Sequence, residues 1–277
     1  MLRGLFTGFF SGFFKIRDAP TVVGRLLMGG LCIGLIGFLW WLVTRGATAE
    51  ARIVSPAVLG SPAEVFGSFK SLWFERALTR NTLVSLKLVA KGFGLAALIA
   101  IPIGVLCGTF NRINAFFAPI TIFGRNVPVV ALVPLTFVIA DTDEGSKILF
   151  LFMACVAFVL FDATQIIAKV PQKYLDTAYT LGASRLQIIF KVLIPLALPD
   201  LFNSLRLLFG LAFGYIILAE MLSQGEGGLG TLIYISQKKG PREHVYLLLF
   251  VITLVAYLLD RLLFLLGRVL FPYRYTD

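Results

Sequence analysis

Charged side chains are scarce in this sequence of 277 residues, where Asp, Glu, Lys and Arg together make up only 14%. Soluble domains carry roughly 25% charged residues. The chain is also 58% hydrophobic and has a mean hydropathy of +0.89. This imbalance excludes an ordinary soluble enzyme and predicts a protein that crosses a membrane several times.

The residues from which proteins build catalytic and metal centres are also few. There is one histidine, His244, and the three cysteines (Cys32, Cys107 and Cys155) fall inside apolar runs without metal-type spacing. We therefore expect buried free thiols and no metal site. The G-x-x-x-x-G-K-[ST] sequence that cradles ATP phosphates does not occur. An integral membrane enzyme is disfavoured because no nucleophile-base set stands out.

Six apolar runs are long enough to cross the hydrocarbon core, which takes about 20 residues of helix. Lipid offers backbone groups no hydrogen-bonding partner, so we predict an all-α polytopic membrane protein with about six transmembrane helices. The first run begins too late and is too long for a cleaved signal peptide. The runs are 26–43, 92–110, 116–140, 148–168, 192–222 and 245–267.

The chain divides into a short N-terminal segment, one membrane domain and a short tail. Residues 1–20 are rich in Phe with basic flanks, which predicts a segment in the membrane interface; a disordered hydrophobic tail is the alternative. Residues 21–270 form the transmembrane domain and 271–277 the C-terminal tail. The net charge of +10 is scattered, so it fits lipid headgroups better than nucleic acid, and no nucleic-acid partner is expected.

Two connections between the runs carry recognisable patterns. Ser61-Pro62-Ala63-Glu64 is typical of a capping box and predicts a short amphipathic helix on the external membrane face. Residues 225–230 match the G-x-G-x-x-G spelling of dinucleotide-binding loops, but a membrane helix precedes them where that motif requires a strand. We expect a flexible external loop there, as part of an outer gate.

The polar segment 171–195 has strong local signals. Pro171 is expected to open a helix and Gly182 to end it. Ser184 and Gln187 form a second capping box, which starts the next helix. The product is two helices at an angle, with Tyr174, Ala178 and Leu181 expected to fill a groove on a partner.

The letters of this segment resemble the cytoplasmic loop of binding-protein-dependent ABC importer permeases. That loop follows the pattern Glu-Ala-Ala, three residues, Gly, nine residues, Ile, one residue, Leu-Pro. Here Asp and Thr replace the first two residues, and Val192 and Ile194 replace Ile and Leu, at unchanged spacing. The resemblance implies that five residues couple the chain to an ATPase: Asp176, Thr177, Ala178, Gly182 and Pro195.

The resemblance extends over about residues 80–267 and points to the nitrate/sulfonate/taurine/bicarbonate subgroup, with the type I ABC importer permease fold. It implies ABC ATPase subunits that bind ATP and Mg²⁺, an external (periplasmic) solute-binding protein, and a second permease copy or paralogue. It places the chain among the lipids of the bacterial cytoplasmic (inner) membrane, as a multi-pass subunit that is not itself an enzyme. The solute would be small and anionic or zwitterionic. Leu88 and the acidic corner 141–144 depart from the family pattern, so the resemblance does not name the solute.

Charges at bilayer depth cost several kcal/mol unless they are paired or hydrated, so they indicate a water-filled path or a partner helix. Lys87 and Lys91 lie four residues apart on one helix face, which suggests water or an anion beside them. Arg206 and Glu220, fourteen residues apart on one helix, are about 21 Å apart and cannot pair. The candidates for a solute path are Lys87, Lys91, Arg125, Asn126, Arg206 and Glu220.

Two alternatives stay open. Arg125 and Arg206 are structural if they pair with Glu220 or Asp162 across helices. The chain is a proton-coupled secondary transporter if Asp162 and Glu220 carry protons. The lack of paired hydrophobic segments that would indicate an inverted repeat argues against the second alternative.

Overall fold

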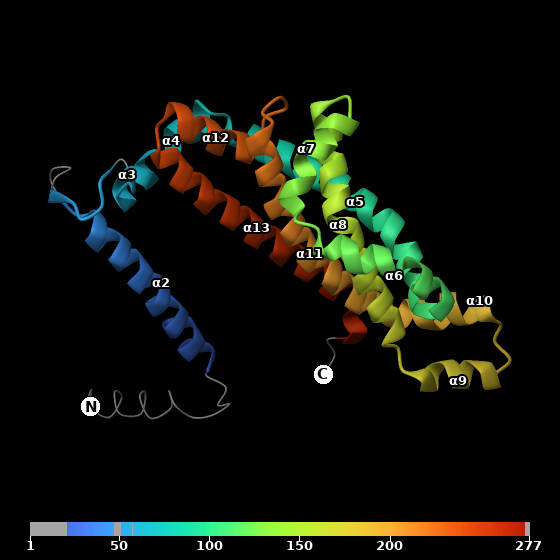
Figure 1. The fold of residues 1–277 in the computed structure, drawn as a ribbon. Helices are drawn as coiled ribbons and strands as arrows, with labels where there is room; N and C mark the ends of the chain where they lie inside the picture. Colours follow the sequence, from blue (N-terminus) through green and yellow to red (C-terminus); the bar gives the residue numbers. More distant parts are fainter. Residues whose placement is uncertain (1–20, 47–50, 57, 275–277) are drawn as a thin grey trace, which may run out of the picture. The chain divides into compact units, whose positions relative to one another are not determined.

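The computed structural model describes residues 21–46, 51–56 and 58–274, and every regular element within these ranges is helical (Figure 1). Residues 1–20 lie outside them, so the interfacial position of that segment stays a prediction. The chain forms two compact units, Met1–Phe66 and Gly67–Asp277. Each unit is described by itself below.

The first unit contains one long apolar helix, α2 (Val22–Thr44), which is long enough to cross a membrane. The helix begins after Thr21, whose hydroxyl accepts a hydrogen bond from the Gly24 amide at 3.1 Å. Within its unit α2 buries only Thr44, so Cys32 is exposed. The expectation that all three cysteines are buried is therefore wrong for Cys32, because nothing in this unit packs over that part of the helix.

A short helix, α3 (Pro62–Gly67), follows in the same unit, and its capping box forms as predicted. The Ser61 amide donates to the Glu64 carboxylate at 2.8 Å, and the Glu64 amide donates to the Ser61 hydroxyl at 3.4 Å. Arg52 also pairs with Glu64 at 2.8 Å. The pKa of the Glu64 carboxyl is lowered to about 2, mainly by the hydrogen bond from the Arg52 guanidinium and to a smaller extent by the one from the Ser61 amide. The expected single amphipathic helix is interrupted after Gly67.

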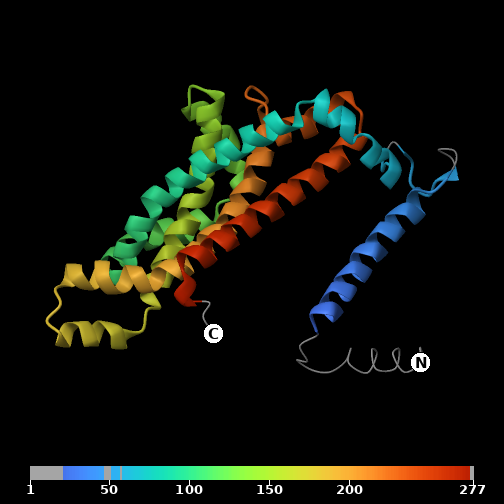
Figure 2. The ribbon, with the colours of Figure 1, turned by 180° about the vertical axis from the view of Figure 1, so that it is seen from behind.

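The second unit is built on four long helices: α5 (Leu78–Thr109), α8 (Asp143–Ala168), α11 (Ile194–Leu222) and α13 (Glu243–Leu270). Helices α5 and α8 lie side by side over much of their length (Figures 1 and 2). The close approach requires glycine at two positions, because a Cβ at Gly92 would overlap Leu151 and one at Gly104 would overlap Ala163. Small residues commonly bring membrane helices together in this way.

The third expected span, 116–140, is not one straight helix. The structure breaks it into α6 (Asn111–Asn126) and α7 (Val129–Ile139), whose axes differ by 105°. Pro128 disfavours the helical region for the residue before it, and Val127 accordingly has an extended backbone (φ −68°, ψ 127°). Within the described ranges, five helices are therefore long and apolar enough to cross a membrane, or six if the bent pair counts as one span.

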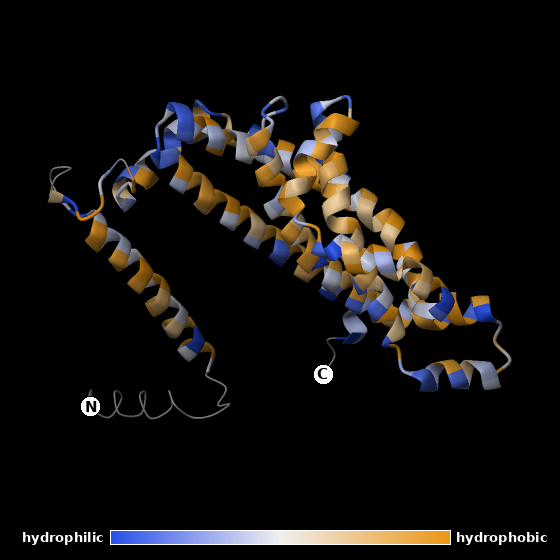
Figure 3. Ribbon diagram, in the orientation of Figure 1, coloured by the Kyte–Doolittle hydropathy of each residue, from blue (hydrophilic) through white to orange (hydrophobic). Residues whose placement is uncertain are grey.

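The two ends of the second unit carry short helices that differ in composition from the long helices between them. The distal end carries α4 (Phe69–Phe74) and α12 (Leu229–Lys239), and the coupling end carries α9 (Gln172–Thr180) and α10 (Arg185–Ile188) (Figure 1). Hydrophobic residues dominate the long helices, whereas α9 is mainly hydrophilic (Figure 3). This distribution places the polar elements beyond the two ends of an apolar bundle.

Candidate functional site

The coupling segment, residues 171–195, projects at one end of the second unit (Figure 1). Helix α9 begins directly after Pro171, as the sequence predicts. The side chain of Asp176 is exposed and accepts a hydrogen bond from Gln172 at 3.0 Å. Thr177 is also exposed, and its hydroxyl donates to the Lys173 carbonyl at 2.8 Å. Both side chains therefore face outward without being needed for packing.

The end of α9 is fixed by backbone geometry that requires glycine. Gly182 has a φ of +78°, a conformation that side chains with a Cβ resist. Its amide donates to the Tyr179 carbonyl at 2.9 Å, and the Ala183 amide donates to the Ala178 carbonyl at 3.0 Å. These two bonds make the Schellman motif. The predicted helix stop is confirmed.

Helix α10 begins at a complete capping box. The Ser184 amide donates to the Gln187 side chain at 2.8 Å, and the Gln187 amide donates to the Ser184 hydroxyl at 3.4 Å. The turn between α9 and α10 is thus closed by hydrogen bonds between residues that are close in the sequence, both where α9 ends and where α10 begins.

Ala178 is buried within its own chain, whereas the sequence suggests that it is available to a partner. It is buried in an apolar cluster with Val105 and Ile188, which fastens α9 to the spans of its own chain. Tyr174 and Leu181 remain available, with 43% and 82% of their surface exposed. The exposed surface of the coupling segment therefore includes Asp176, Thr177 and large apolar side chains, but not Ala178.

Pro195 lies inside a membrane helix rather than on the coupling surface. A π-helical turn, Ile189–Leu193, joins α10 to α11, and the Ile194 amide donates back to the Ile189 carbonyl. Pro195 follows in the first turn of α11, where its missing N–H interrupts the normal helical ladder. We expect Pro195 to shape the helix that leaves the coupling segment.

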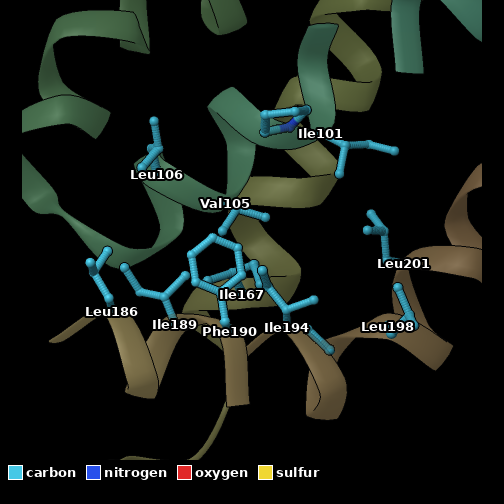
Figure 4. Close-up of a pocket in the computed structure, with 12 residues that line it drawn as sticks. Ile101, Val105, Leu106, Ile167, Leu186, Ile189, Phe190, Ile194, Leu198 and Leu201 are labelled. Carbon is cyan, nitrogen blue, oxygen red and sulfur yellow. The ribbon is translucent and has the colours of Figure 1, made fainter. Parts of the chain in front are cut away.

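An apolar pocket of about 400 Å³ lies beside the coupling segment (Figure 4). Its walls come from α5, α8, α10, the π-helical turn and the start of α11. Val105, Ile167 and Phe190 are among its lining residues. The lining offers almost no polar surface to a charged solute. This pocket therefore does not suit the anion path that the sequence suggests.

The structure places a carboxylate between the two lysines of α5. Lys91 Nζ lies 2.5 Å and Lys87 Nζ 4.0 Å from the same Glu144 oxygen, Oε1. Glu144 stands in the first turn of α8, next to α5. A protein carboxylate therefore lies beside the two lysines, where the sequence suggests water or an anion.

The two arginines do not pair as the structural alternative expected. Arg206 pairs with Asp260 of α13 at 3.1 Å, instead of with Asp162 or Glu220. The Arg125 guanidinium lies 3.8 Å from the ring centre of Phe161, a cation–π contact. Asp162 instead accepts a hydrogen bond from Ser204.

Asn126 ends α6 next to this arginine. Its side-chain amide donates to the Ile122 carbonyl at 2.7 Å, one turn back in the same helix. Arg125 and Asn126 therefore stand together at the 105° break before α7.

Glu220 is fully buried and bonded into the fold. The Ser85 hydroxyl reaches its two oxygens at 2.7 and 2.9 Å, and the Gly230 amide donates to it at 2.9 Å. The carboxyl of Glu220 therefore links α11 to α5 and α12. It is used to hold these helices together and is not exposed to a solute path.

The loop 223–228, which the sequence predicts to be flexible, is bonded to two of the long helices. The Glu226 amide donates to Asp143 at 3.0 Å, and the Gly228 amide donates to Asn81 at 2.8 Å. Asp143 also binds Lys147 at 2.7 Å and accepts a hydrogen bond from Ser223. Side chains of α5 and α8 therefore hold this loop through its backbone.

Sequence reasoning missed this anchoring network. An acid at 220 followed by the glycine-rich stretch 225–230 was a usable signal, because glycine permits close approach of backbone to a carboxylate. A Cβ at Gly228 would indeed overlap the Glu220 carboxyl. The partners on α5, more than 130 residues away, leave no local trace.

Histidine and cysteine do not assemble into a metal centre in the described ranges, where no group of three or more His, Cys, Asp or Glu side chains could hold an ion. His244 is buried, with its Nε2 2.8 Å from the Ser71 hydroxyl. Cys107 and Cys155 are buried free thiols, as predicted.

Comparison with known proteins identifies the family. Residues 100–272 match the family described as binding-protein-dependent transport system inner membrane component. The bicarbonate transport system permease protein CmpB of Synechocystis sp. is 31% identical over 235 residues, which cover 82% of this chain and 83% of the relative. The taurine transport system permease protein TauC of Escherichia coli is 29% identical, covering 88% and 89%.

The nitrate import permease protein NrtB of Leptolyngbya laminosa is 26% identical, covering 89% of this chain and 85% of the relative. A solved structure of the MetNI methionine ABC transporter, in an inward-facing conformation, superposes with a TM-score of 0.63 at 22% identity. The match covers 73% of this chain and 98% of that one, and it confirms the type I ABC importer permease fold. The chain therefore belongs to the family of binding-protein-dependent ABC transporter inner-membrane permeases.

Proposed function

We propose that this permease moves a small anionic or zwitterionic solute, of the bicarbonate, nitrate, sulfonate or taurine kind, inward across the bacterial cytoplasmic (inner) membrane. Relatives named for bicarbonate, taurine and nitrate support this solute class. An external (periplasmic) binding protein delivers the solute at the distal end. A second permease copy or paralogue completes the path, and separate ATPase subunits bind ATP and Mg²⁺ at the coupling end.

The coupling segment carries this proposal. Its helix α9 is held by local bonds at both ends, and Tyr174 and Leu181 expose large apolar surface beyond the bundle. A short, fixed helix with exposed apolar side chains suits a groove on a partner protein. Asp176 and Thr177 add polar contacts on the same helix. In this proposal Gly182 fixes the shape of the segment and Pro195 fixes the start of the helix that carries motion into the membrane.

The solute path is proposed near the basic residues that the fold leaves at its surface. Lys87 and Lys91 face outward from α5, and Arg125 and Asn126 are exposed at the break between α6 and α7. A guanidinium beside an amide can bind a planar oxyanion through two hydrogen bonds. Glu220 and Arg206 are assigned to the support of this path, since each already has a partner within the chain.

The experiment is to reconstitute the permease with its ATPase and binding protein in liposomes and to replace Asp176 by Lys. Because the Asp176 side chain bonds only Gln172 on its own helix, the variant should insert normally. We expect solute-stimulated ATP hydrolysis to be lost, because the reversed charge opposes the partner surface. Gly182→Val should act likewise, since a β-branched residue resists the φ of +78°.

The matched control is Asp176→Asn, which keeps the acceptor for Gln172 and removes only the charge. It should retain more stimulated hydrolysis than the Lys variant. Normal stimulated hydrolysis in an inserted Asp176→Lys complex would contradict the coupling assignment.

A further inference from the structure

Three charged side chains meet near the distal end of α5 and α8. We propose that Lys87, Lys91 and Glu144 form an anion-binding subsite, in which an oxyanion group of the solute replaces Glu144 as the counter-ion of the two lysines. The identity of the ligand as the transported solute rests on the proposed function. The binding of a small oxyanion does not.

One carboxylate here serves two ammonium groups. Both Nζ atoms approach the same oxygen, Glu144 Oε1, at 2.5 Å from Lys91 and 4.0 Å from Lys87. The lysines lie one helical turn apart on α5, so they present their charges on one side. The three groups together carry one excess positive charge, and Lys87 is held loosely enough to bind another anion.

A neighbouring lysine shows what a purely structural pair looks like in this chain. Lys147 has no exposed surface and lies 2.7 Å from Asp143, one turn away on the same helix. Lys87 and Lys91, by contrast, expose 65% and 45% of their side chains, and Glu144 exposes 33%. The subsite is therefore accessible to a small anion from outside, whereas the Lys147 side chain is not.

The helix surface beside the lysines has room for a small anion. Ala90 and Gly94 are exposed on the same side of α5. A Cβ added at Gly94 would meet no atom within 4 Å. Small side chains here leave the ammonium groups as the most prominent feature of the surface.

Exchange of counter-ions explains how a solute could enter this position at little cost. An ammonium group in a membrane helix needs water or an opposite charge beside it. Bicarbonate, nitrate and sulfonate oxygens accept hydrogen bonds from ammonium as a carboxylate does. The incoming oxyanion therefore replaces Glu144 without leaving a lysine unpaired, and the displaced carboxylate is exposed enough to be hydrated.

The direct test uses Ala90→Cys as a reporter in the full complex, with Cys32, Cys107 and Cys155 replaced by Ala. The rate of thiol modification is measured with a negatively charged methanethiosulfonate reagent and with a neutral one of similar size. Relative to a free thiol, we expect the charged reagent to be favoured about tenfold, because positive charge concentrates anions locally. Added nitrate should remove this preference. The Lys87→Gln/Lys91→Gln double variant should lack it.

Glu144→Gln provides the second arm. Since this change removes the competing carboxylate, the nitrate concentration that gives half-maximal protection should fall about tenfold. An unchanged concentration would overturn the exchange. Failure of both reagents to modify the reporter would also overturn the subsite, because the surface would then not be open to water.

Uptake by the reconstituted importer links the subsite to transport. Lys91→Gln should lower uptake of labelled bicarbonate, nitrate or taurine about tenfold, while the control Lys239→Gln stays within about twofold. Lys239 is exposed on α12, outside the subsite. Unchanged uptake in the double Gln variant would overturn the transport role. If the unmodified complex transported none of the three solutes, the proposed solute class would fail, and the thiol assay would still decide the subsite.

Discussion

At the scale of single residues, Glu220 shows how a charge in a membrane helix can serve the fold. A carboxyl at this depth is costly unless its oxygens find donors. Here they bond the Ser85 hydroxyl and the Gly230 amide, and Ser85 in turn accepts from the Leu229 amide at 2.9 Å. One side chain thereby satisfies the first turn of α12 and links it to two other helices.

The prediction is that Glu220→Ala destabilises the protein. The change leaves the Ser85 hydroxyl and the Gly230 amide without their buried acceptor, at a cost of about 1–3 kcal/mol for each group left unpaired. Thermal unfolding of the purified protein in detergent measures the loss. Glu226→Ala is the matched control, because Glu226 is exposed and bonds Asp143 through its backbone only. Equal effects of the two changes would refute the structural role of Glu220.

At the scale of elements, the coupling segment and the 223–228 loop differ in the range of their bonds. The turn between α9 and α10 is closed by bonds that span three to five residues. The 223–228 loop is closed by bonds to α5 and α8, at separations of 83 and 147 residues. The first can form alone, whereas the second requires the assembled bundle.

We expect Ser184→Ala to loosen the coupling segment without disturbing the spans. Loss of an N-cap side chain costs about 1 kcal/mol, which corresponds to about fivefold faster opening of the first turn of α10. Hydrogen exchange of the amides in 185–188 provides the measurement. Thr180→Ala serves as control, because the Thr180 hydroxyl bonds only within α9. Slow exchange retained in the Ser184 variant would show that the cap does not hold the turn.

The sequence separation of the bonded residues also explains which features could be predicted from the sequence. Pro171, Gly182 and Ser184 act on their immediate neighbours, so the shape of the coupling segment followed from local rules. The burial of Ala178 did not, because it depends on Val105 and Ile188 meeting around it.

The same limit applies to the spans and to the charges. Long apolar runs predicted membrane helices, and Pro128 was visible, but the 105° bend depends on how α6 and α7 pack against α8. Likewise, Lys87 and Lys91 were evident as candidates. Their partner Glu144 belongs to another helix, and only the fold brings it within reach.

At the scale of the whole molecule, the second unit separates two polar ends by an apolar bundle. The helix from Arg185 to Leu222 has 38 residues, or about 57 Å at 1.5 Å per residue. This length exceeds the hydrocarbon core of about 30 Å, so the helix tilts or extends beyond it.

Topology can be measured with single cysteines at the two ends. If the coupling end is cytoplasmic, a membrane-impermeant thiol reagent applied to intact cells should label Glu226→Cys and leave Leu181→Cys unlabelled. Both side chains are exposed, so access depends only on the side of the membrane. Permeabilised cells, in which both positions should react, provide the control. Labelling of residue 181 in intact cells would reverse the orientation.

The anchoring of the 223–228 loop has a consequence for biosynthesis. Ser85 leaves the ribosome 144 residues before Leu229, the amide that it bonds. At about 5–20 residues per second, that interval lasts about 7–29 s. Throughout it, the buried hydroxyl of Ser85 waits in the membrane without its final partners. The carboxylate of Asp143 waits for a shorter time, because the Glu226 amide follows it by 83 residues. The distal end is therefore completed late, after most of the spans have been inserted, and the nascent permease depends on water or the insertion machinery to satisfy these groups until then.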